Sequence, residues 1–227
     1  MPLDVNYSAR YRCVFIHVPK TGGMSICEAL DIGSWHHTAL QTRRMYGHQF
    51  NNYWKFSIVR NPYDRLVSAW EYIRAGGMQN WYDIKLQREL STLWGNSHQD
   101  FDEFCEKALP VVSGKWLHFL PQTYFLCAND ASILCDYVGR FEQLDEAWQV
   151  ITEQVGHTGE LPHANATKKR RHYAEYYTSS YTMALVEAVY HSDFDIWQYE
   201  RGRSSIGRAS GWQPEGFVGS SPIDSTT

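Results

Sequence analysis

Two turns, each following a short apolar run, place the strongest constraint on how this chain folds. The run 13–18 leads into Pro19-Lys20-Thr21-Gly22-Gly23, and the run 54–59 leads into Arg60-Asn61-Pro62. Each run has the length and apolar character of a buried strand, and helix-compatible residues follow each turn. Repeated strand, turn and helix units predict a parallel sheet with helices on its faces. We therefore expect an α/β protein with a P-loop-like, three-layer fold, in which a central parallel sheet is flanked by helices.

The first turn predicts a phosphate site. Gly22 and Gly23 allow backbone N–H groups to approach an anion closely, and the helix that follows presents its positive N-terminal end. Lys20 adds a full charge, and the hydroxyls of Thr21 and Ser25 add donors. Because the lysine precedes the glycines, the Walker A order is absent and a nucleoside-triphosphate kinase fits poorly.

The second turn predicts a further anion contact. Asn61 is a favourable N-cap and Pro62 a favourable first helical residue, so a helix is expected from Pro62 to about Arg74. Arg60 lies at the end of the strand, where it can contact a phosphate near the helix start, and Ser68 lies two turns into the helix, where it can do so if the strand edge folds back over it. Together the two turns predict a clamp for the two ends of a doubly phosphorylated nucleotide.

The rest of the chain predicts one more strand and several helices. A strand is expected near 133–141. Apolar residues at helical spacing predict a helix that begins at Leu144 and stops at Gly156, and this spacing makes Trp148 a core residue. The remaining expected helices lie at 23–31, 100–108, 116–126 and 178–191. From residue 204 onward Ser, Gly and Pro dominate, so we expect one folded domain, 1–203, and a disordered tail, 204–227.

Composition limits the class of protein. The 227 residues carry a formal net charge of −4, which argues against a nucleic-acid partner because a general nucleic-acid binder needs a basic face. No apolar run reaches the about 20 residues needed to cross a bilayer, and the first residues lack the layout of a signal peptide, so we expect no membrane partner and a cytoplasmic location. Five cysteines without a C-x-x-C pair predict neither a disulfide framework nor a metal site.

The two turns resemble the 5′-phosphosulfate loop and the 3′-phosphate motif of sulfotransferases that use 3′-phosphoadenosine 5′-phosphosulfate. The resemblance is greatest to the carbohydrate branch, which includes heparan sulfate 2-O- and chondroitin-type enzymes. Later segments, Tyr137–Glu142 and Leu161–Asn165, are similar to the family's mid-chain strand and C-terminal region. The resemblance covers roughly residues 12–199.

This resemblance implies a transferase that moves a sulfuryl group from the nucleotide donor to a hydroxyl of a saccharide or similar metabolite. Adenosine 3′,5′-bisphosphate is then the departing product, and Lys20 is expected to meet the charge that develops on it. The residues carried over to donor binding are Pro19, Lys20, Thr21, Gly22, Gly23, Met24, Ser25, Arg60 and Ser68.

The resemblance also implies a histidine base between the two motifs, where the sequence offers three candidates. A neutral imidazole titrates near working pH and suits this role. His37, which precedes Thr38-Ala39, best resembles the family's segment and is the first choice, with His36 second and His48 also present. His17 precedes the phosphate loop on its strand and is interpreted as structural.

Other basic and aromatic residues remain open to more than one interpretation. The resemblance implies that a basic C-terminal loop closes the nucleotide site, so Lys168 and Lys169 are assigned to the donor phosphates, with an anionic acceptor as the alternative. Arg43 and Arg44 are assigned to the acceptor. Acceptor-binding segments are expected within 32–52 and 76–130, whose aromatics either stack on sugar rings or fill a core: Trp81, Tyr82, Trp94 and Trp116. A P-loop nucleotide-dependent kinase and a noncatalytic nucleotide-binding module of the same fold are the alternatives.

Overall fold

A computed structural model describes residues 5–95, 97–162 and 171–202. The expected tail, 204–227, and the expected donor ligands Lys168 and Lys169 lie outside these residues, so their assignments stay predictions. Among the described helices, none combines the length and the apolar character that crossing a membrane requires.

The sheet of the described residues contains four strands in the order β1-β2-β3-β4. β2 (Cys13–Ile16), β3 (Trp54–Val59) and β4 (Tyr137–Arg140) are parallel, with Phe15 opposite Phe56 in the β2–β3 pair. The α/β class is therefore confirmed. The short strand β1 (Tyr7–Ser8) pairs antiparallel with β2. The sheet is therefore mixed, whereas the sequence predicted a parallel sheet.

One face of the sheet packs against α1 (Gly23–Leu30) and α9 (Leu144–Val155). Successive side chains of a strand point to opposite faces, and on this face the rings of Phe15 and Phe56 stack with centroids 5.0 Å apart. Trp148 belongs to the same core cluster and is 7% exposed, which confirms that it fills the core.

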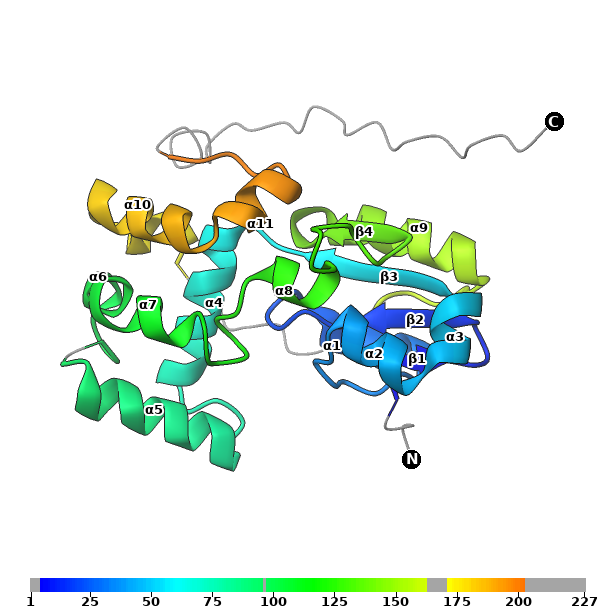
Figure 1. Ribbon diagram of the computed structural model, residues 1–227, viewed down its shortest axis with the longest axis horizontal. Coiled ribbons are helices and arrows are strands. Elements are labelled where there is room, and N and C mark those ends of the chain that lie inside the picture. The colour runs from blue at the N-terminus through cyan, green and yellow to red at the C-terminus, as the bar shows by residue number, and fades with distance from the viewer. Residues whose placement is uncertain (1–4, 96, 163–170, 203–227) are drawn as a thin grey trace.

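The other face of the sheet is covered by α2 (Ala39–Met45), α3 (Gly47–Asn52) and α8 (Gln122–Leu126), as Figure 1 shows. Val14 and Ile16 of β2 point to this side and belong to its core cluster. The helices on both faces give the three layers that the sequence predicts.

A second group of helices lies beyond the carboxyl end of β3, on the left of Figure 1. Its centre is α4 (Pro62–Arg74), whose Asn61 side chain accepts a hydrogen bond from Tyr63 N and whose first residue is Pro62, as predicted. Around α4 lie α5 (Trp81–Leu93), α6 (Phe101–Glu103), the π-helix Phe104–Ala108, α7 (Leu109–Val112), the 3-10 helix Tyr173–Tyr176, α10 (Ser180–Val189) and α11 (His191–Ile196).

Several element boundaries differ from the sequence-based expectation. The helix expected over 116–126 is reduced to α8 because Pro121 has no N–H and disfavours a helical residue before it. The strand expected over 133–141 is limited to β4. Helices α2, α3 and α5 were not predicted, although Thr38 and Gln41 form a capping box at the start of α2. Gly156 ends α9 at φ 70°, as expected.

Candidate functional site

The loop between β2 and α1 is tight, and two of its residues have left-handed backbone conformations, Lys20 at φ 70° and Gly22 at φ 77°. Gly23 lies against the His17 ring, where an added Cβ would come within 2.3 Å of the ring carbon Cδ2. A side chain at this position would therefore force the His17 ring to move. Gly22 gives α1 no side-chain cap, so the first N–H groups of the helix are directed to whatever lies in front of the loop.

Arg65 of α4 binds the backbone of the loop between β2 and α1. Its Nε donates to the Pro19 carbonyl over 3.1 Å, and one of its terminal nitrogens donates to the Leu120 carbonyl over 2.6 Å. The side chain is 1% exposed. Within the loop, the Thr21 hydroxyl donates to the Val18 carbonyl over 2.9 Å, so Thr21 can offer its main chain, but not this hydrogen, to an anion.

Arg60 joins the two turns that the sequence singled out. Its Nη1 donates to the Lys20 carbonyl over 3.1 Å, while Nε lies 2.8 Å and Nη2 2.7 Å from Oδ2 of Asp64. The guanidinium lies 4.1 Å from the centroid of Phe141. The Gln122 side chain binds the backbone N–H and the carbonyl of Arg60, both at 2.8 Å. Asp64, Phe141 and Gln122 thus fix Arg60 beside the loop between β2 and α1.

A cluster of polar side chains lies next to Lys20. The Lys20 ammonium is 3.9 Å from the centroid of the Tyr72 ring, and the Tyr72 hydroxyl donates to Asp83 over 2.7 Å. Nε2 of His118 lies 3.2 Å from the other oxygen of Asp83. The His36 ring lies 6.4 Å from that of His118. These contacts bring α4, α5 and the segment before α8 to the loop.

His36 is oriented by the backbone. Its Nδ1 lies 2.9 Å from the His17 carbonyl, and because a carbonyl only accepts, Nδ1 carries the hydrogen and Nε2 keeps its lone pair in the neutral ring. Burial, with a contribution from the nearby Lys20 charge, lowers the pKa of His36 to about 4. The ring is therefore neutral at pH 7.

A model of the sulfotransferase family matches residues 4–200. The chain belongs to the sulfotransferase family. No curated protein and no solved structure matches it. Membership supports sulfuryl transfer to a hydroxyl-bearing acceptor, and sulfotransferases generally take the group from 3′-phosphoadenosine 5′-phosphosulfate.

The expected base of this sulfotransferase, His37, contacts a different part of the structure. Its Nδ1 lies 3.1 Å from Oδ1 of Asn6, and its ring stacks on Trp35 with centroids 6.0 Å apart. His48 is exposed on α3. Of the three histidines between the motifs, His36 is the one whose described contacts reach the loop.

The other residues predicted to bind the sulfate donor lie on the helices that follow the two turns. Met24 and Ser25 lie in the first turn of α1, with Met24 41% exposed and Ser25 buried. Ser68 is half-buried in α4, two turns beyond Arg60. Its role in binding a phosphate stays a prediction.

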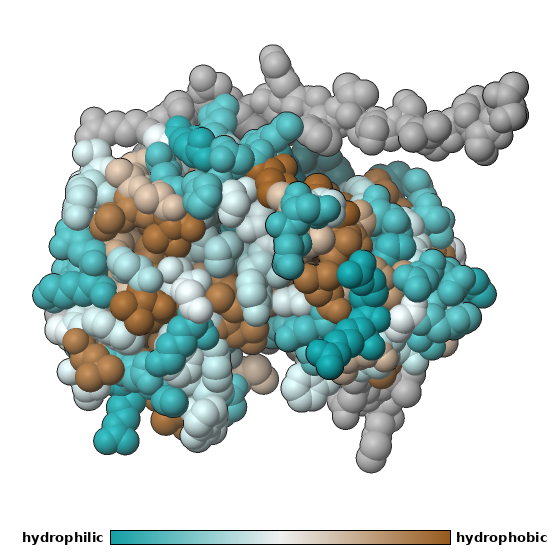
Figure 2. Space-filling model, viewed as in Figure 1, coloured by the Kyte–Doolittle hydropathy of each residue, from teal (hydrophilic) through white to brown (hydrophobic). Residues whose placement is uncertain are grey.

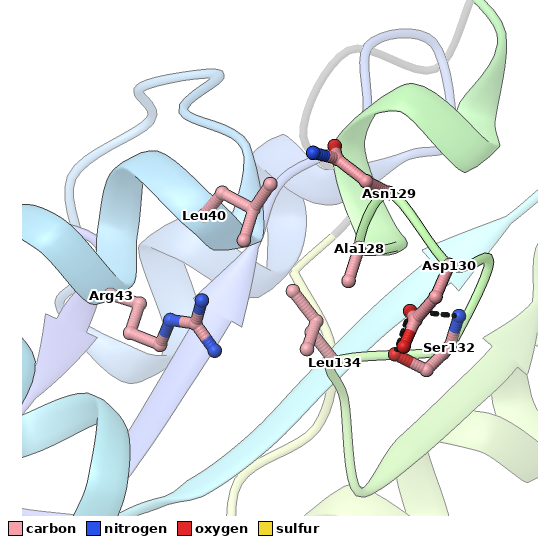
Figure 3. Close-up of a pocket in the computed structure, with 7 residues that line it drawn as sticks. All are labelled: Leu40, Arg43, Ala128, Asn129, Asp130, Ser132 and Leu134. Atoms are coloured by element: carbon pink, nitrogen blue, oxygen red, sulfur yellow. Dashed lines mark hydrogen bonds between the residues drawn. The ribbon is translucent and has the colours of Figure 1, made fainter.

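Two described cavities lie away from the loop between β2 and α1. One, of about 430 Å³, contains the side chain of Arg43, which points from α2 toward Leu134 (Figure 3). On its far side Asp130 accepts hydrogen bonds from Ser132. The other, of about 610 Å³, lies beside Tyr11 and His157. The site is therefore defined by the loop and its contacts and not by either cavity.

The aromatic residues that the sequence assigned either to sugar stacking or to a core differ in their exposure. Trp116 is 3% exposed, whereas Trp81, at the start of α5, is 73% exposed. Tyr82 and Trp94 are partly buried against the core. On the face shown in Figure 2, hydrophobic residues lie between hydrophilic ones and do not form one continuous band. Trp81 is the aromatic of this group that offers a ring to solvent.

Three residues of the cluster were missed by sequence reasoning: Tyr72, Asp83 and His118. Tyr72 follows Ser68 by one helical turn, and this spacing places both on one side of α4. Asp83 and His118 come from segments far from both motifs, and their local sequence gives no signal of a shared site.

Proposed function

We propose that this sulfotransferase moves the sulfuryl group of 3′-phosphoadenosine 5′-phosphosulfate to a hydroxyl of a saccharide or similar metabolite. The observation that carries the proposal is the hydrogen bond from Arg60 Nη1 to the Lys20 carbonyl, which joins two anion-binding turns. The turns follow β2 and β3, which are parallel neighbours. One ligand with two phosphate groups can therefore contact both.

The residues of the first turn fit the 5′-phosphosulfate. An uncapped helix N-terminus, a tight glycine backbone and the Lys20 ammonium form a donor set suited to an anion. We assign the 5′ end of the donor to Pro19 through Ser25, and its 3′-phosphate to Arg60 and Ser68. Lys168 and Lys169 complete the donor contacts as sequence-based predictions.

Lys20 has the central role in the proposed reaction. As the acceptor oxygen bonds to sulfur, the bond from sulfur to the 5′-phosphate oxygen breaks, and negative charge grows on that departing oxygen. A cation held at this point stabilises the transition state more than the ground state. The loop fixes the Lys20 backbone through its contact with Arg60.

His36 is the base in this proposal, in place of His37. Its Nε2 lone pair takes the hydrogen of the acceptor hydroxyl, and its Nδ1 hydrogen stays on the His17 carbonyl. A pKa of about 4 in the protein alone makes His36 a weak base. The negative charges of a bound donor raise that pKa toward the working range, because an opposite charge favours the imidazolium.

The acceptor side of the proposal rests on α5 and on its neighbours. Trp81 opens this helix and exposes its ring, and a flat aromatic ring can stack on the apolar face of a sugar. Asp83, two residues further, reaches the cluster around Lys20 through Tyr72. We assign the saccharide to the start of α5, with its reacting hydroxyl directed toward Lys20.

Transfer of labelled sulfate tests the proposal. The purified protein is incubated with ³⁵S-labelled donor and a panel of saccharides and small alcohols, and Lys20→Ala serves as the inactive variant. Lys115→Ala is the matched control, because Lys115 is exposed and pairs with Glu89. We expect wild type and Lys115→Ala to transfer the label to a saccharide, and Lys20→Ala to transfer none. Tight binding of adenosine 3′,5′-bisphosphate with no labelled product would instead support a noncatalytic module, and phosphoryl transfer from ATP would support a kinase.

A further inference from the structure

Asp83 is a buried carboxylate that collects four hydrogen bonds. Its oxygens accept from the Tyr72 hydroxyl over 2.7 Å, from Met78 N and Asn80 Nδ2 over 2.9 Å each, and from His118 Nε2 over 3.2 Å. The residue is 1% exposed. Burial alone raises the pKa of a carboxyl group, but these hydrogen bonds outweigh it and lower the pKa of Asp83 well below its usual range. The group is therefore a fixed negative charge at neutral pH.

The chain before α5 is shaped around this carboxylate. Gly77 has φ 58°, and a Cβ there would lie 2.5 Å from Oδ2 of Asp83. Any larger residue would displace the carboxylate as well as strain the backbone. Asn80 also caps α5 by accepting a hydrogen bond from Asp83 N over 2.9 Å. Asp83 is consequently held from both its backbone and its side chain.

Asp83 fixes the ring of Tyr72. The phenol hydrogen is committed to the carboxylate, and burial, together with this hydrogen bond, raises the pKa of Tyr72, so the hydroxyl stays a donor. The His118 ring packs against the Tyr72 ring edge to face, with centroids 4.9 Å apart. A phenol that donates to an anion has a more electron-rich ring, which strengthens its attraction for a cation on its face.

We propose that Tyr72, held by Asp83, is a positioning residue that fixes the ammonium of Lys20 for catalysis. The loop fixes one end of this side chain, because the Lys20 carbonyl is bound by Arg60 at 3.1 Å. The ring of Tyr72 fixes the other end, 3.9 Å from its centroid. A flexible four-carbon side chain thereby loses much of its freedom before the donor binds, which lowers the entropic cost of reaching the transition state.

The contact between Lys20 and Tyr72 can be measured without any turnover. Lysines are converted to ¹³C-dimethyl-lysines, which stay charged, and the Lys20 signal is identified by its absence from Lys20→Arg. A cation over an aromatic face has its methyl signal moved upfield by the ring current. We expect this upfield position in wild type and Tyr72→Trp, a smaller upfield shift in Tyr72→Phe, which keeps the ring but loses the bond to Asp83, and its loss in Tyr72→Leu.

The matched control repeats the same chemistry elsewhere. Tyr176 donates to Glu71 over 2.8 Å and lies under the guanidinium of Arg171, 4.5 Å from the ring centroid. Tyr176→Leu therefore removes a tyrosine–carboxylate bond and a cation contact without touching Lys20. The Lys20 signal should be unchanged in this variant and shifted part of the way in Asp83→Asn. An unchanged Lys20 signal in Tyr72→Leu would overturn the proposal. If Tyr72→Leu fails to fold, Tyr72→Trp provides the test, and loss of the upfield position in that variant would overturn the proposal.

Kinetics give the second readout, which rests on the proposed function. Tyr72→Leu should lower kcat on the order of tenfold, and Tyr72→Phe by less than about threefold, because the ring and not the hydroxyl faces the ammonium. Affinity for adenosine 3′,5′-bisphosphate should change less than about twofold in both. A wild-type kcat in Tyr72→Leu would contradict the positioning role. The methyl signals respond as described even if no acceptor is sulfated, so a failure of the proposed function is distinguishable from a failure of this inference.

Discussion

The two strand-to-helix turns have the same architecture but use it differently. At the first turn, α1 starts at Gly23 with no side-chain cap, so its N–H groups face outward. At the second, Asn61 caps α4 through Tyr63 N, and Asn61 N itself donates to Glu142 over 2.6 Å. Pro62 removes one more donor. In the function that we propose, the first turn therefore offers its main chain to an anion, whereas the second satisfies its main chain internally and offers the Arg60 side chain.

Among the variants that test the difference between the two turns, removal of the Lys20 charge is expected to have the largest effect on catalysis. Lys20→Ala should lower kcat by ~10³-fold, in the range measured when one transition-state charge contact is lost. The circular dichroism spectrum and the melting temperature should stay close to those of wild type, because the side chain is partly exposed. Kinetics like those of wild type would contradict the role that we assign to the first turn.

The imidazole of His36 lies beside the first turn, and its burial makes the free energy of unfolding of the protein depend on pH. Burial lowers the pKa of His36 from 6.5 to about 4, so between these values the unfolded chain binds more protons than the folded one. The free energy of unfolding should therefore fall as the pH drops from 6.5 toward 4. In His36→Gln that fall should be smaller by roughly 2 kcal/mol, as measured by urea denaturation. His48→Gln is the control, and an equal pH dependence in His36→Gln and wild type would be inconsistent with a neutral buried His36.

Arg60→Ala tests the second turn. We expect affinity for adenosine 3′,5′-bisphosphate to fall about 20-fold, since a charge-assisted hydrogen bond is worth ~1.5–3 kcal/mol, while kcat at saturating donor changes little. Isothermal titration calorimetry measures the affinity. Arg12→Ala, at an exposed position, is the control. If kcat fell as strongly as in Lys20→Ala with no loss of affinity, the two turns would not differ in the way described.

Gly23→Ala tests the close approach at the first turn. The new Cβ would lie 2.3 Å from the His17 ring, and relief of this overlap should cost ~1–3 kcal/mol of folding stability. Gly47→Ala is the control because a Cβ there meets nothing within 4 Å. Denaturant unfolding of both variants measures the difference. Equal stabilities would mean that His17 moves aside at little cost.

Asn61→Ala should have the smallest effect. Loss of an N-cap costs ~1 kcal/mol, here at α4, where Asn61 accepts from Tyr63 N over 3.0 Å. Donor affinity should stay within about twofold of wild type, because the cap serves the fold. A large loss of donor affinity, measured by calorimetry, would show that the backbone of the second turn also takes part in donor binding.

Local patterns in the sequence predicted the features that depend on neighbouring residues. The two turns, the Asn61 cap, the Gly156 stop and the buried Trp148 all follow from spacing within a few residues. The family was also recognisable from the first turn and from the second. These features could be predicted because turn and cap geometry is determined by the residues that form it.

The cluster around Lys20 could not be predicted because its residues meet only in the folded chain. Asp83 and His118 are separated by a helical segment and share a hydrogen bond. His36 and His37 are adjacent in sequence, yet one contacts the His17 carbonyl and the other Asn6. Consecutive loop residues point in different directions, so local sequence cannot decide which of the two reaches a site.

The buried guanidinium of Arg65 has a consequence for how such a site can be assembled. It donates to the Pro19 carbonyl and also to the carbonyls of His118 and Leu120. A fragment that kept β2, α1 and α4 but lacked the segment before α8 would leave the Arg65 guanidinium in the interior with only the Pro19 carbonyl as an acceptor. The loop between β2 and α1 is thus not a portable module, and any graft of it onto another scaffold has to include α4 and the distant segment that contains His118 and Leu120.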